Sequence, residues 1–151
     1  MRAPLILMSV LFLMGFSACK DQSIKDQDLI EQYISDNNLE TEVTDEGLHY
    51  IIHDAGNDNK PNFNSTIEVH YEGFTLEDEK FDSSYDRGMT STFPLRNLIP
   101  GWIIGLQLIG EGGDITLIIP SNLAYGASPP PNSVIGNNEV LRFRLELFDV
   151  Q

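Results

Sequence analysis

The stretch Pro-Gly-Trp-Ile-Ile-Gly-Leu-Gln-Leu-Ile at residues 100–109 is apolar on nearly every side when it is drawn as a helix. Proline suits the first position of a helix, because the N–H that it lacks would be unsatisfied there anyway. A helix that is apolar all round is enclosed rather than laid on a surface. Its two glycines lower the intrinsic helix propensity, so packing must hold it. The sequence therefore predicts a short helix buried inside the domain.

The segments on both sides of this helix alternate between apolar and polar residues, as half-buried strands do. Four segments are expected to be strands: 48–54, 65–74, 114–119 and 139–150. Several such strands and one short apolar helix predict an α+β fold. In this fold a curled, mostly antiparallel sheet is wrapped around one central helix, and an extra helix precedes it.

The first 18 residues are typical of a bacterial export signal. Arg2 is followed by an apolar run over residues 3–16, which is shorter than a membrane-spanning helix requires. The next residues lead to Cys19, the single Cys of the chain, so no internal disulfide can form. Residues 16–19, Phe-Ser-Ala-Cys, resemble the lipobox of bacterial lipoproteins. That resemblance implies a lipidated Cys19, for example with palmitate, and a domain anchored in the cell envelope on the periplasmic side or outer surface. The alternative is a plain secretory signal with an incidental Cys.

Residues 19–43 are expected to join this signal to the folded domain. Residues 20–27 are polar and predict a flexible linker. An apolar stripe predicts a helix over residues 28–37, with Asp28 as its N-cap and an Asn pair at its end. The stripe comprises Leu29, Ile30, Tyr33 and Ile34. A helix this short needs a surface to pack on, either its own domain or a second copy, so we expect a monomer or a weak dimer.

The charge and composition exclude several classes of function. Nine Lys and Arg against 23 Asp and Glu give a formal net charge of −14 over 151 residues. A nucleic-acid binder is excluded because phosphate contacts need a basic surface. Three His residues without a converging carboxylate motif predict no metal site, and no cofactor is expected. The apolar fraction of 41% suffices for one compact domain.

Four sequence blocks occur in the order and near the spacing of a known enzyme family. They are Val69-His70-Tyr71-Glu72-Gly73, Lys80-Phe81-Asp82-Ser83-Ser84 with Asp86-Arg87, Phe93-Pro94-Leu95 with Ile99-Pro100-Gly101-Trp102, and Ala124-Tyr125-Gly126-Ala127. Together they resemble the FKBP-type peptidyl-prolyl cis-trans isomerases over more than half of the chain. The resemblance places the isomerase domain at 44–151, after the signal at 1–18 and the tether at 19–43. It implies accelerated rotation of X-Pro bonds in exported or unfolded proteins.

The resemblance also implies an aromatic substrate pocket with three catalytic residues, Tyr71, Asp82 and Tyr125. Tyr125 would donate its hydroxyl to the carbonyl of the rotating bond, and Asp82 would bias the orientation of that carbonyl. Trp102 would lie beneath the proline ring. The other substrate-binding residues would be Phe81, Phe93, Leu98, Ile99, Ile135 and Phe143.

Two further contacts follow from the same resemblance. The backbone N–H of Ile99 would hold a substrate carbonyl, and Arg87 would support the site by pairing with Asp82 and Tyr71. Ordinary core packing stays open as an alternative role for Phe143.

A pocket of this kind needs no metal, cofactor or covalent step. Rotation about the amide has a barrier of roughly 18–20 kcal/mol, because it breaks amide resonance. A dry apolar cavity favours the twisted amide, which is less dipolar than the planar one, and oriented hydrogen bonds hold the flanking peptide. Macrolides such as rapamycin are implied ligands. The chain departs from many relatives at Ser91, where a second aromatic is common, and at Gly136, where Pro is common. The alternative function is an FKBP-fold peptide-binding or chaperone module with low turnover.

Overall fold

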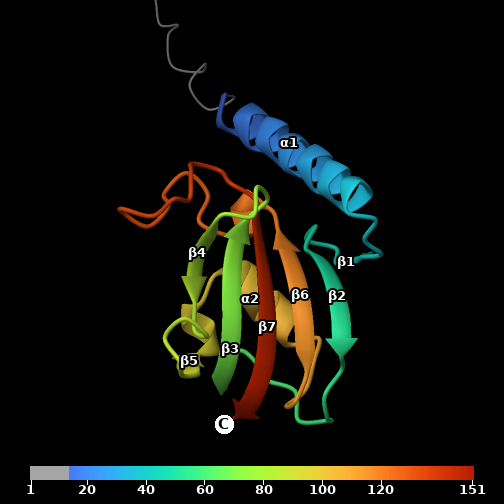
Figure 1. The fold of residues 1–151 in the computed structure, drawn as a ribbon. Coiled ribbons are helices and arrows are strands. Elements are labelled where there is room, and N and C mark those ends of the chain that lie inside the picture. The colour runs from blue at the N-terminus through green and yellow to red at the C-terminus, as the bar shows by residue number, and fades with distance from the viewer. Residues whose placement is uncertain (1–13) are drawn as a thin grey trace, which may run out of the picture.

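The structure is a computed structural model that describes residues 14–151. Over these residues one antiparallel sheet has the strand order β1-β2-β6-β7-β3-β4, and β5 also pairs with β3 (Figure 1). The predicted α+β fold is confirmed. In chain order the elements are α1 (Met14–Asp36), β1 (Glu42–Val43), β2 (His49–Asp54), β3 (Thr66–Thr75), β4 (Lys80–Ser83), β5 (Ser91–Pro94), η1 (Leu95–Asn97), α2 (Pro100–Leu106), β6 (Asp114–Ile119), η2 (Ser121–Leu123) and β7 (Leu141–Val150).

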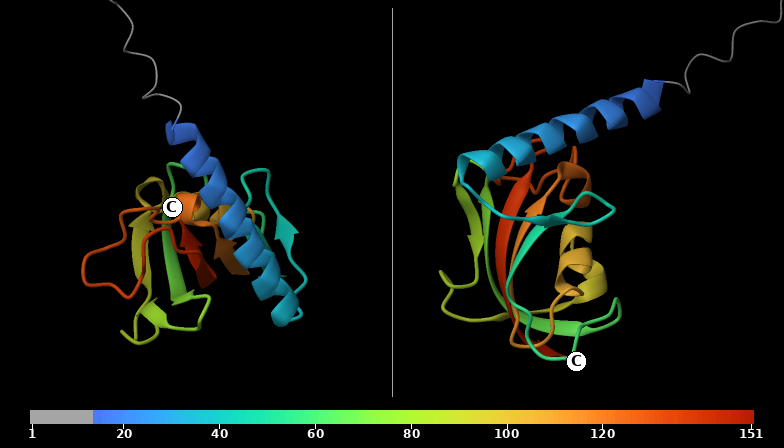
Figure 2. Two further views of the ribbon diagram at one scale, coloured as in Figure 1. Left: turned by 90° about the horizontal axis from the view of Figure 1, so that it is seen from above. Right: turned by 90° about the vertical axis from the view of Figure 1, so that its right-hand side faces the viewer.

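Helix α2 lies in the concave side of the curled sheet, as the sequence predicts (Figure 2). A Cβ added to Gly101 would lie 2.5 Å from Cγ2 of Ile119, and one added to Gly105 would lie 2.6 Å from Cδ1 of Leu117. The two glycines therefore let the helix backbone approach β6 closely. The helix ends at Leu106, three residues earlier than predicted.

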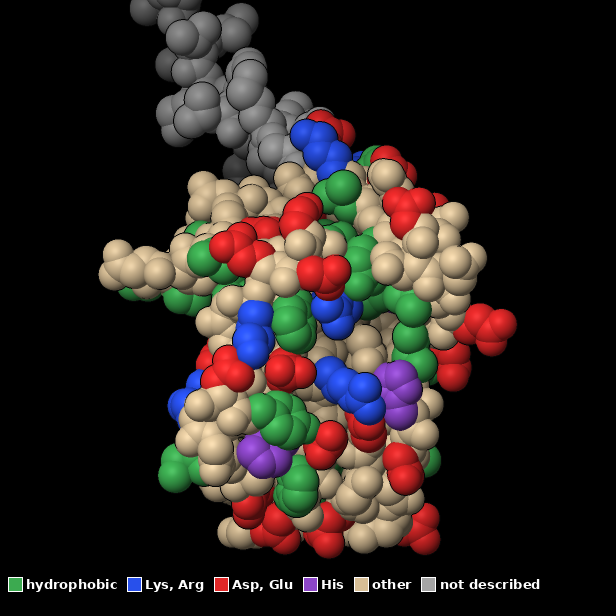
Figure 3. Space-filling model, in the orientation of Figure 1, with side chains coloured by type: hydrophobic (Ala, Val, Ile, Leu, Met, Phe, Trp, Pro, Cys, Tyr) green, Lys and Arg blue, Asp and Glu red, His purple; other side chains and the backbone are tan. Residues whose placement is uncertain are grey.

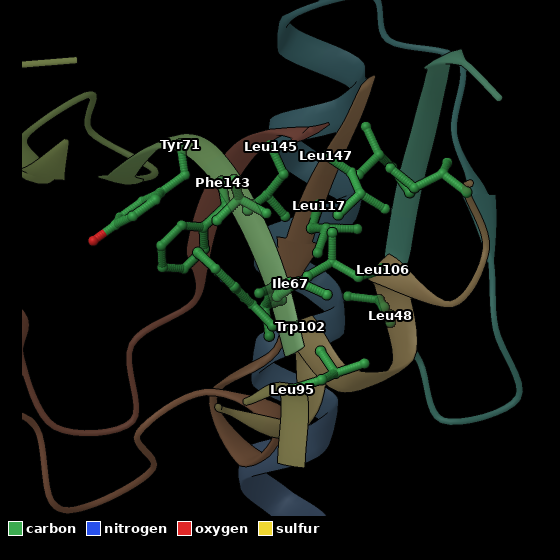
Figure 4. Packing of buried hydrophobic residues seen from close by; sticks show 14 of the residues in the cluster. Leu48, Ile67, Tyr71, Leu95, Trp102, Leu106, Leu117, Phe143, Leu145 and Leu147 are labelled. Atoms are coloured by element: carbon green, nitrogen blue, oxygen red, sulfur yellow. The ribbon is translucent and has the colours of Figure 1, made fainter. Parts of the chain in front are cut away.

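The core lies between α2 and the sheet. Along β3 and β7, buried residues alternate with more exposed ones, which matches the predicted period of two. The buried side of these strands and of β6 packs on α2 in one cluster (Figure 4). The largest fully buried side chains of this cluster are Leu48, Ile67, Leu95, Leu106, Ile109, Ile115, Leu117, Ile119, Leu141 and Leu145.

Three edge strands were not predicted: β1 at one edge of the sheet, and β4 and β5 at the other. Strand β4 pairs with one half of β3 and β5 pairs with the other half, so together they form one interrupted edge. Each is only four residues long, which is too short for an alternating pattern to stand out. The segment 84–90 between them leaves the sheet and carries Arg87.

Helix α1 corrects the predicted linker and the start of the predicted helix. Residues 20–27 are helical and Asp28 lies in the middle of α1, so neither a linker nor an N-cap is present there. The helix extends because its polar segment is anchored on the domain through the buried carboxylate of Asp26. The apolar stripe is also narrower than predicted, since Leu29 is half exposed whereas Ile30 is fully buried.

The predicted helix end is confirmed, and so is one of the two predicted partners of the helix. Asn38 adopts a φ of 51°, and the N–H of Leu39 bonds back to the carbonyl of Ile34 at 3.0 Å. Such a left-handed residue after the last turn is a common helix stop. Ile30 packs against Ile118 and Val140, so the helix docks on its own domain.

The N-terminal predictions fall largely outside the described part of the chain. Residues 1–13 of the predicted signal peptide are not described, and α1 begins at Met14, before the predicted cleavage point. Among residues 14–151, no helix combines the length and hydropathy needed to cross a membrane.

The convex face of the sheet carries basic and acidic side chains next to each other (Figure 3). Arg142 pairs with Asp78 at 2.7 Å and Arg144 pairs with Asp114 at 2.6 Å. Helix α2 and the core cluster lie on the opposite, concave side.

Candidate active site

Trp102 is the centre of an aromatic cluster at the start of α2. The helix begins with Pro100 directly after Ile99, and this places the Trp102 ring under the curl of the sheet with 4% of its surface exposed. The ring makes edge-to-face contacts with Tyr71, at 5.0 Å between centroids, and with Phe143, at 5.2 Å (Figure 4). Edge-to-face pairs at this spacing are the favoured geometry for aromatic rings.

Phe81 and Phe93 complete this cluster. Phe81 lies edge-to-face on Phe143 at 5.3 Å, and Phe93 lies 6.4 Å from Trp102. We call the five rings the aromatic floor: Tyr71, Phe81, Phe93, Trp102 and Phe143.

Gly73 on β3 makes room for two of these rings. A Cβ on Gly73 would lie 2.6 Å from Cε2 of Phe81 and 2.7 Å from Cε1 of Phe143. Any side chain at this position would push the two rings apart.

A cavity of about 550 Å³ opens above the aromatic floor. All ten residues that were predicted to be catalytic or substrate-binding line it: Tyr71, Phe81, Asp82, Phe93, Leu98, Ile99, Trp102, Tyr125, Ile135 and Phe143. The structure therefore brings them together, and their roles in a reaction stay predictions. Phe143 is both a buried core residue and part of the cavity lining, so its position fits the predicted pocket role and the alternative of core packing.

The opposite side of the cavity is a loop, residues 124–138, which we call the roof. It adds lining residues that were not predicted: Pro130, Pro131, Asn132 and Ser133. The run of three prolines was a usable signal, because it stiffens an extended loop. Asn97 also lines the cavity without having been predicted, and its surrounding sequence carries no distinguishing pattern.

A polar triad lies at the rim. The hydroxyl of Tyr71 donates to Oδ2 of Asp82 at 2.6 Å, while Arg87 donates to Oδ1 of Asp82 at 2.5 Å and to the Tyr71 hydroxyl at 2.8 Å. Arg87 thus makes the two predicted contacts from outside the cavity. Burial alone would raise the pKa of Asp82, but the hydrogen bonds from Tyr71 and Arg87 bring that pKa below its ordinary value. Asp82 is therefore a carboxylate at neutral pH.

Three of the cavity-lining residues that were predicted to act, Ile99, Trp102 and Tyr125, carry a hydrogen-bond donor without a partner among the described residues; for Trp102 it is the buried indole N–H. The N–H of Ile99 lies just before the first turn of α2, where helix N–H groups have no intrahelical acceptor. The hydroxyl of Tyr125 likewise makes no hydrogen bond to residues 14–151. Burial, and then the charge of Asp82, raise the pKa of Tyr125, so its hydroxyl keeps its proton in alkaline solution.

The two positions that differ from many relatives lie beside the pocket. The Ser91 hydroxyl is 3.4 Å from a guanidinium nitrogen of Arg87, and Ser91 is absent from the cavity lining. The N–H of Gly136 bonds to the carboxylate of Glu139. Neither Ser91 nor Gly136 is among the residues that line the cavity.

The three His residues are held by separate local contacts. His49 bonds to Thr41 and Gln27, and His53 bonds to Thr116. His70 bonds to the Ser84 hydroxyl. Within the described residues, no three His, Cys, Asp or Glu side chains are grouped so that they could hold a metal ion.

Comparisons with known proteins agree with this geometry. The sequence profile described as FKBP-type peptidyl-prolyl cis-trans isomerase matches residues 57–148. FkpA of Escherichia coli strain K12, an FKBP-type peptidyl-prolyl cis-trans isomerase, is 37% identical over 131 residues, which are 87% of this chain and 47% of FkpA. The peptidyl-prolyl cis-trans isomerase Mip of Coxiella burnetii is 40% identical over 105 residues, 70% of this chain and 45% of Mip. The chain thus spans about half the length of these relatives.

Solved structures show the same fold. The crystal structure of FkpA from Escherichia coli matches with a TM-score of 0.76 at 33% identity, over 91% of this chain and 64% of that one. The crystal structure of AtFKBP13 matches with a TM-score of 0.68 at 30% identity, over 74% of this chain and 99% of that one. The chain belongs to the family of FKBP-type peptidyl-prolyl cis-trans isomerases.

Proposed function

We propose that the protein accelerates cis–trans rotation of X-Pro bonds in unfolded or exported polypeptides. The observation that carries this proposal is the cavity of about 550 Å³, which has an aromatic floor and unpaired donors that include the Ile99 N–H and the Tyr125 hydroxyl. Among its lining residues only Asp82 is charged, and that charge is already neutralised by Arg87. Such a site can bind and desolvate a proline, but its lining holds no His, Lys or Cys that could activate a hydroxyl or act as a nucleophile for bond cleavage.

The rate enhancement follows from how the two states of the amide differ. The proline ring packs on Trp102, and the flanking peptide is held by the N–H of Ile99. Removing water from the imide favours the twisted amide, which is less dipolar than the planar one. The Tyr125 hydroxyl then donates to the carbonyl as it turns, a fixed contact that needs no reorganisation during the reaction. The reaction proceeds by rotation alone.

An isomerase assay on short X-Pro peptides tests the proposal. We expect the purified protein to raise the exchange rate above background and the Tyr125→Phe variant to lower kcat/KM about tenfold, the equivalent of losing one hydrogen bond of roughly 1.4 kcal/mol. Tyr33→Phe is the matched control, because Tyr33 lies on α1, packs against the separate cluster of Ile30, Ile118 and Val140, and does not line the cavity. It should retain the wild-type rate.

Binding measurements separate an isomerase from a binding or chaperone module with low turnover. Trp102 is the single Trp of the chain, so its fluorescence reports directly on the pocket. We propose that proline peptides and macrolides such as rapamycin quench it. Quenching without any catalysed exchange would favour the binding module. Absence of both would mean that the pocket is misassigned.

We further propose that Cys19 carries lipid and holds the domain on the bacterial cell envelope. The support is the lipobox-like sequence and the place of Cys19 within α1, seven residues before Asp26. At a rise of about 1.5 Å per residue, the anchor would lie only about 10 Å along the helix from a residue that is fixed to the domain. Cells fed with radiolabelled palmitate should label the wild type and leave Cys19→Ser unlabelled.

A further inference from the structure

Helix α1 lies across the end of the domain from which the roof of the pocket projects, and it contacts η2 (Figure 2). Asp26 is fully buried at this contact, which is rare for a carboxylate unless it is paired. Its Oδ2 atom accepts hydrogen bonds from the backbone N–H of Ser121 at 2.8 Å and from the Ser121 hydroxyl at 2.6 Å. Its Oδ1 atom accepts a bond from the side-chain amide of Gln22 at 2.7 Å.

Ser121 connects Asp26 to both sequence neighbours of Tyr125 through backbone hydrogen bonds. The carbonyl of Ser121 accepts hydrogen bonds from the N–H of Ala124 at 3.1 Å and from the N–H of Gly126 at 2.9 Å. The carbonyl of Gly126 in turn accepts a bond from the N–H of Asn138 at 2.7 Å, which joins the two ends of the roof. Tyr125 is thus flanked by two backbone groups that are both tied to the residue held by Asp26.

The same helix also holds the far end of this segment. Ile30 lies one turn after Asp26 and packs with Ile118 and Val140 in a separate buried cluster. Ile118 precedes the segment that contains η2 and the roof, and Val140 follows it. Helix α1 therefore fixes both the entry and the exit of the chain segment that carries Tyr125.

We propose that Asp26 is a positioning residue for the isomerase reaction: through Ser121 it fixes the Tyr125 hydroxyl above the aromatic floor. This inference rests on the proposed function, in which Tyr125 is the donor to the rotating carbonyl. A small displacement of a fixed donor lowers the rate strongly, since its benefit depends on geometry set before the reaction. The hydrogen-bond partners of Asp26 are Gln22 and Ser121, neither of which belongs to the aromatic floor, so we expect binding of the proline ring to be unaffected. Helix α1 is accordingly part of the catalytic unit.

Variants of the full chain test this role in peptide-exchange kinetics, at temperatures where each variant is folded by circular dichroism. We expect Asp26→Ala to lower kcat about fivefold to tenfold with KM changed less than about twofold. Asp26→Asn should recover roughly half of the wild-type kcat or more, because its amide oxygen can accept the same two bonds. Asp28→Ala, a change at an exposed carboxylate two residues along α1, is the matched control and should leave both constants unchanged.

A double variant distinguishes positioning from a general loss of structure. If Asp26 acts through Tyr125, adding Asp26→Ala to Tyr125→Phe lowers kcat less than about twofold further, because the donor is already gone. An equal fold loss in both backgrounds, an unchanged kcat in Asp26→Ala, or no recovery in Asp26→Asn overturns the positioning role and leaves the isomerase proposal standing. Failure of that proposal shows separately, as a wild-type rate no higher than background, and it removes both.

Discussion

The aromatic floor and the roof enclose the same cavity but are built in opposite ways. In the floor, Tyr71, Trp102 and Phe143 are 3–5% exposed and belong to the core cluster of the domain. The roof is mostly exposed and is held at its base by backbone hydrogen bonds to Ser121 and Gly126. Ile135, 6% exposed, is the roof residue that reaches back into the core.

This difference teaches that the floor residues both bind the ligand and stabilise the fold, whereas the roof residues shape the pocket without contributing much to stability. A floor ring contributes to the fold and to the pocket through the same contacts. A roof residue can change the pocket while the core keeps its packing. Variants on the two sides should therefore differ in the ratio of stability loss to activity loss.

The largest expected effect is that of Trp102→Ala. Truncating a buried aromatic usually lowers the free energy of unfolding by about 3–5 kcal/mol. We expect a value near 3 kcal/mol, because one side of this ring already faces the cavity, and thus a fall in Tm of roughly 6–12 °C. Catalysed exchange should be lost as well. If denaturant unfolding showed a loss below about 1 kcal/mol for Trp102→Ala, the aromatic floor would not be part of the hydrophobic core.

A smaller loss is expected from Gly73→Ala, which adds a single methyl beneath two floor rings. Overpacking of this kind lowers the free energy of unfolding by about 1–3 kcal/mol. Because Phe81 and Phe143 must move, peptide affinity measured by Trp102 fluorescence should fall too.

The matched change in the roof is Gly136→Ala. Its added Cβ would meet only the carboxylate end of Glu139, at 3.1 Å, and that flexible side chain can move. We expect a stability change within about 0.5 kcal/mol. If Gly136→Ala destabilised the protein as much as Gly73→Ala does, the contrast between floor and roof would be wrong.

Pro131→Ala tests the roof at a residue that lines the cavity. It should lower the free energy of unfolding by less than about 1 kcal/mol, chiefly because the unfolded chain gains conformational entropy when the proline is removed. A more flexible roof must be ordered when the peptide binds, so affinity should fall about threefold. Pro129→Ala is the control from the same run of prolines, since Pro129 does not line the cavity. Equal affinity losses for the two variants would show that the roof acts by stiffness alone.

The sequence predicted three floor residues, Tyr71, Trp102 and Phe143, well because they lie in segments with a clear local pattern, whereas Phe81 and Phe93 lie on edge strands of four residues each. Strands β3 and β7 alternate over ten residues each, and α2 is apolar all round with Pro100 at its start. The order of the four family blocks then placed Phe81 and Tyr125 beside them. The alternation indicates which face of each strand is buried, and the pairing of β3 with β7 then brings Tyr71 and Phe143 to the same side of the sheet.

The N-terminal part of helix α1 was predicted poorly because the contact that holds it on the domain is long-range and polar. Residues 20–27 have the composition of a linker, and the interaction that orders them joins Asp26 to Ser121, 95 positions away. A single buried carboxylate leaves no periodic pattern. The shape of the roof is equally hard to predict, because it depends on hydrogen bonds between backbone groups. Every residue type except proline carries the same backbone groups, so the sequence does not indicate which of them will pair.

A further small effect concerns the pH dependence of the rim. The pKa of Asp82 is lowered in the folded protein, so its carboxylate stabilises the fold above the unfolded value near 3.9, and this stabilisation is lost as the pH falls through the folded value. Since the Asp82 side chain is 42% exposed, the contribution should stay below about 1 kcal/mol.

The measurement is the difference in unfolding free energy between wild type and Asp82→Asn. This difference should be constant above about pH 5 and shrink below about pH 4. Added salt should reduce it at neutral pH, because a half-exposed ion pair is screened. Asp21→Asn, at an exposed carboxylate of α1, should show neither trend. If the free-energy difference between wild type and Asp82→Asn grew on acidification, the charged form of Asp82 would destabilise the fold. The hydrogen bonds from Tyr71 and Arg87 would then not stabilise the carboxylate.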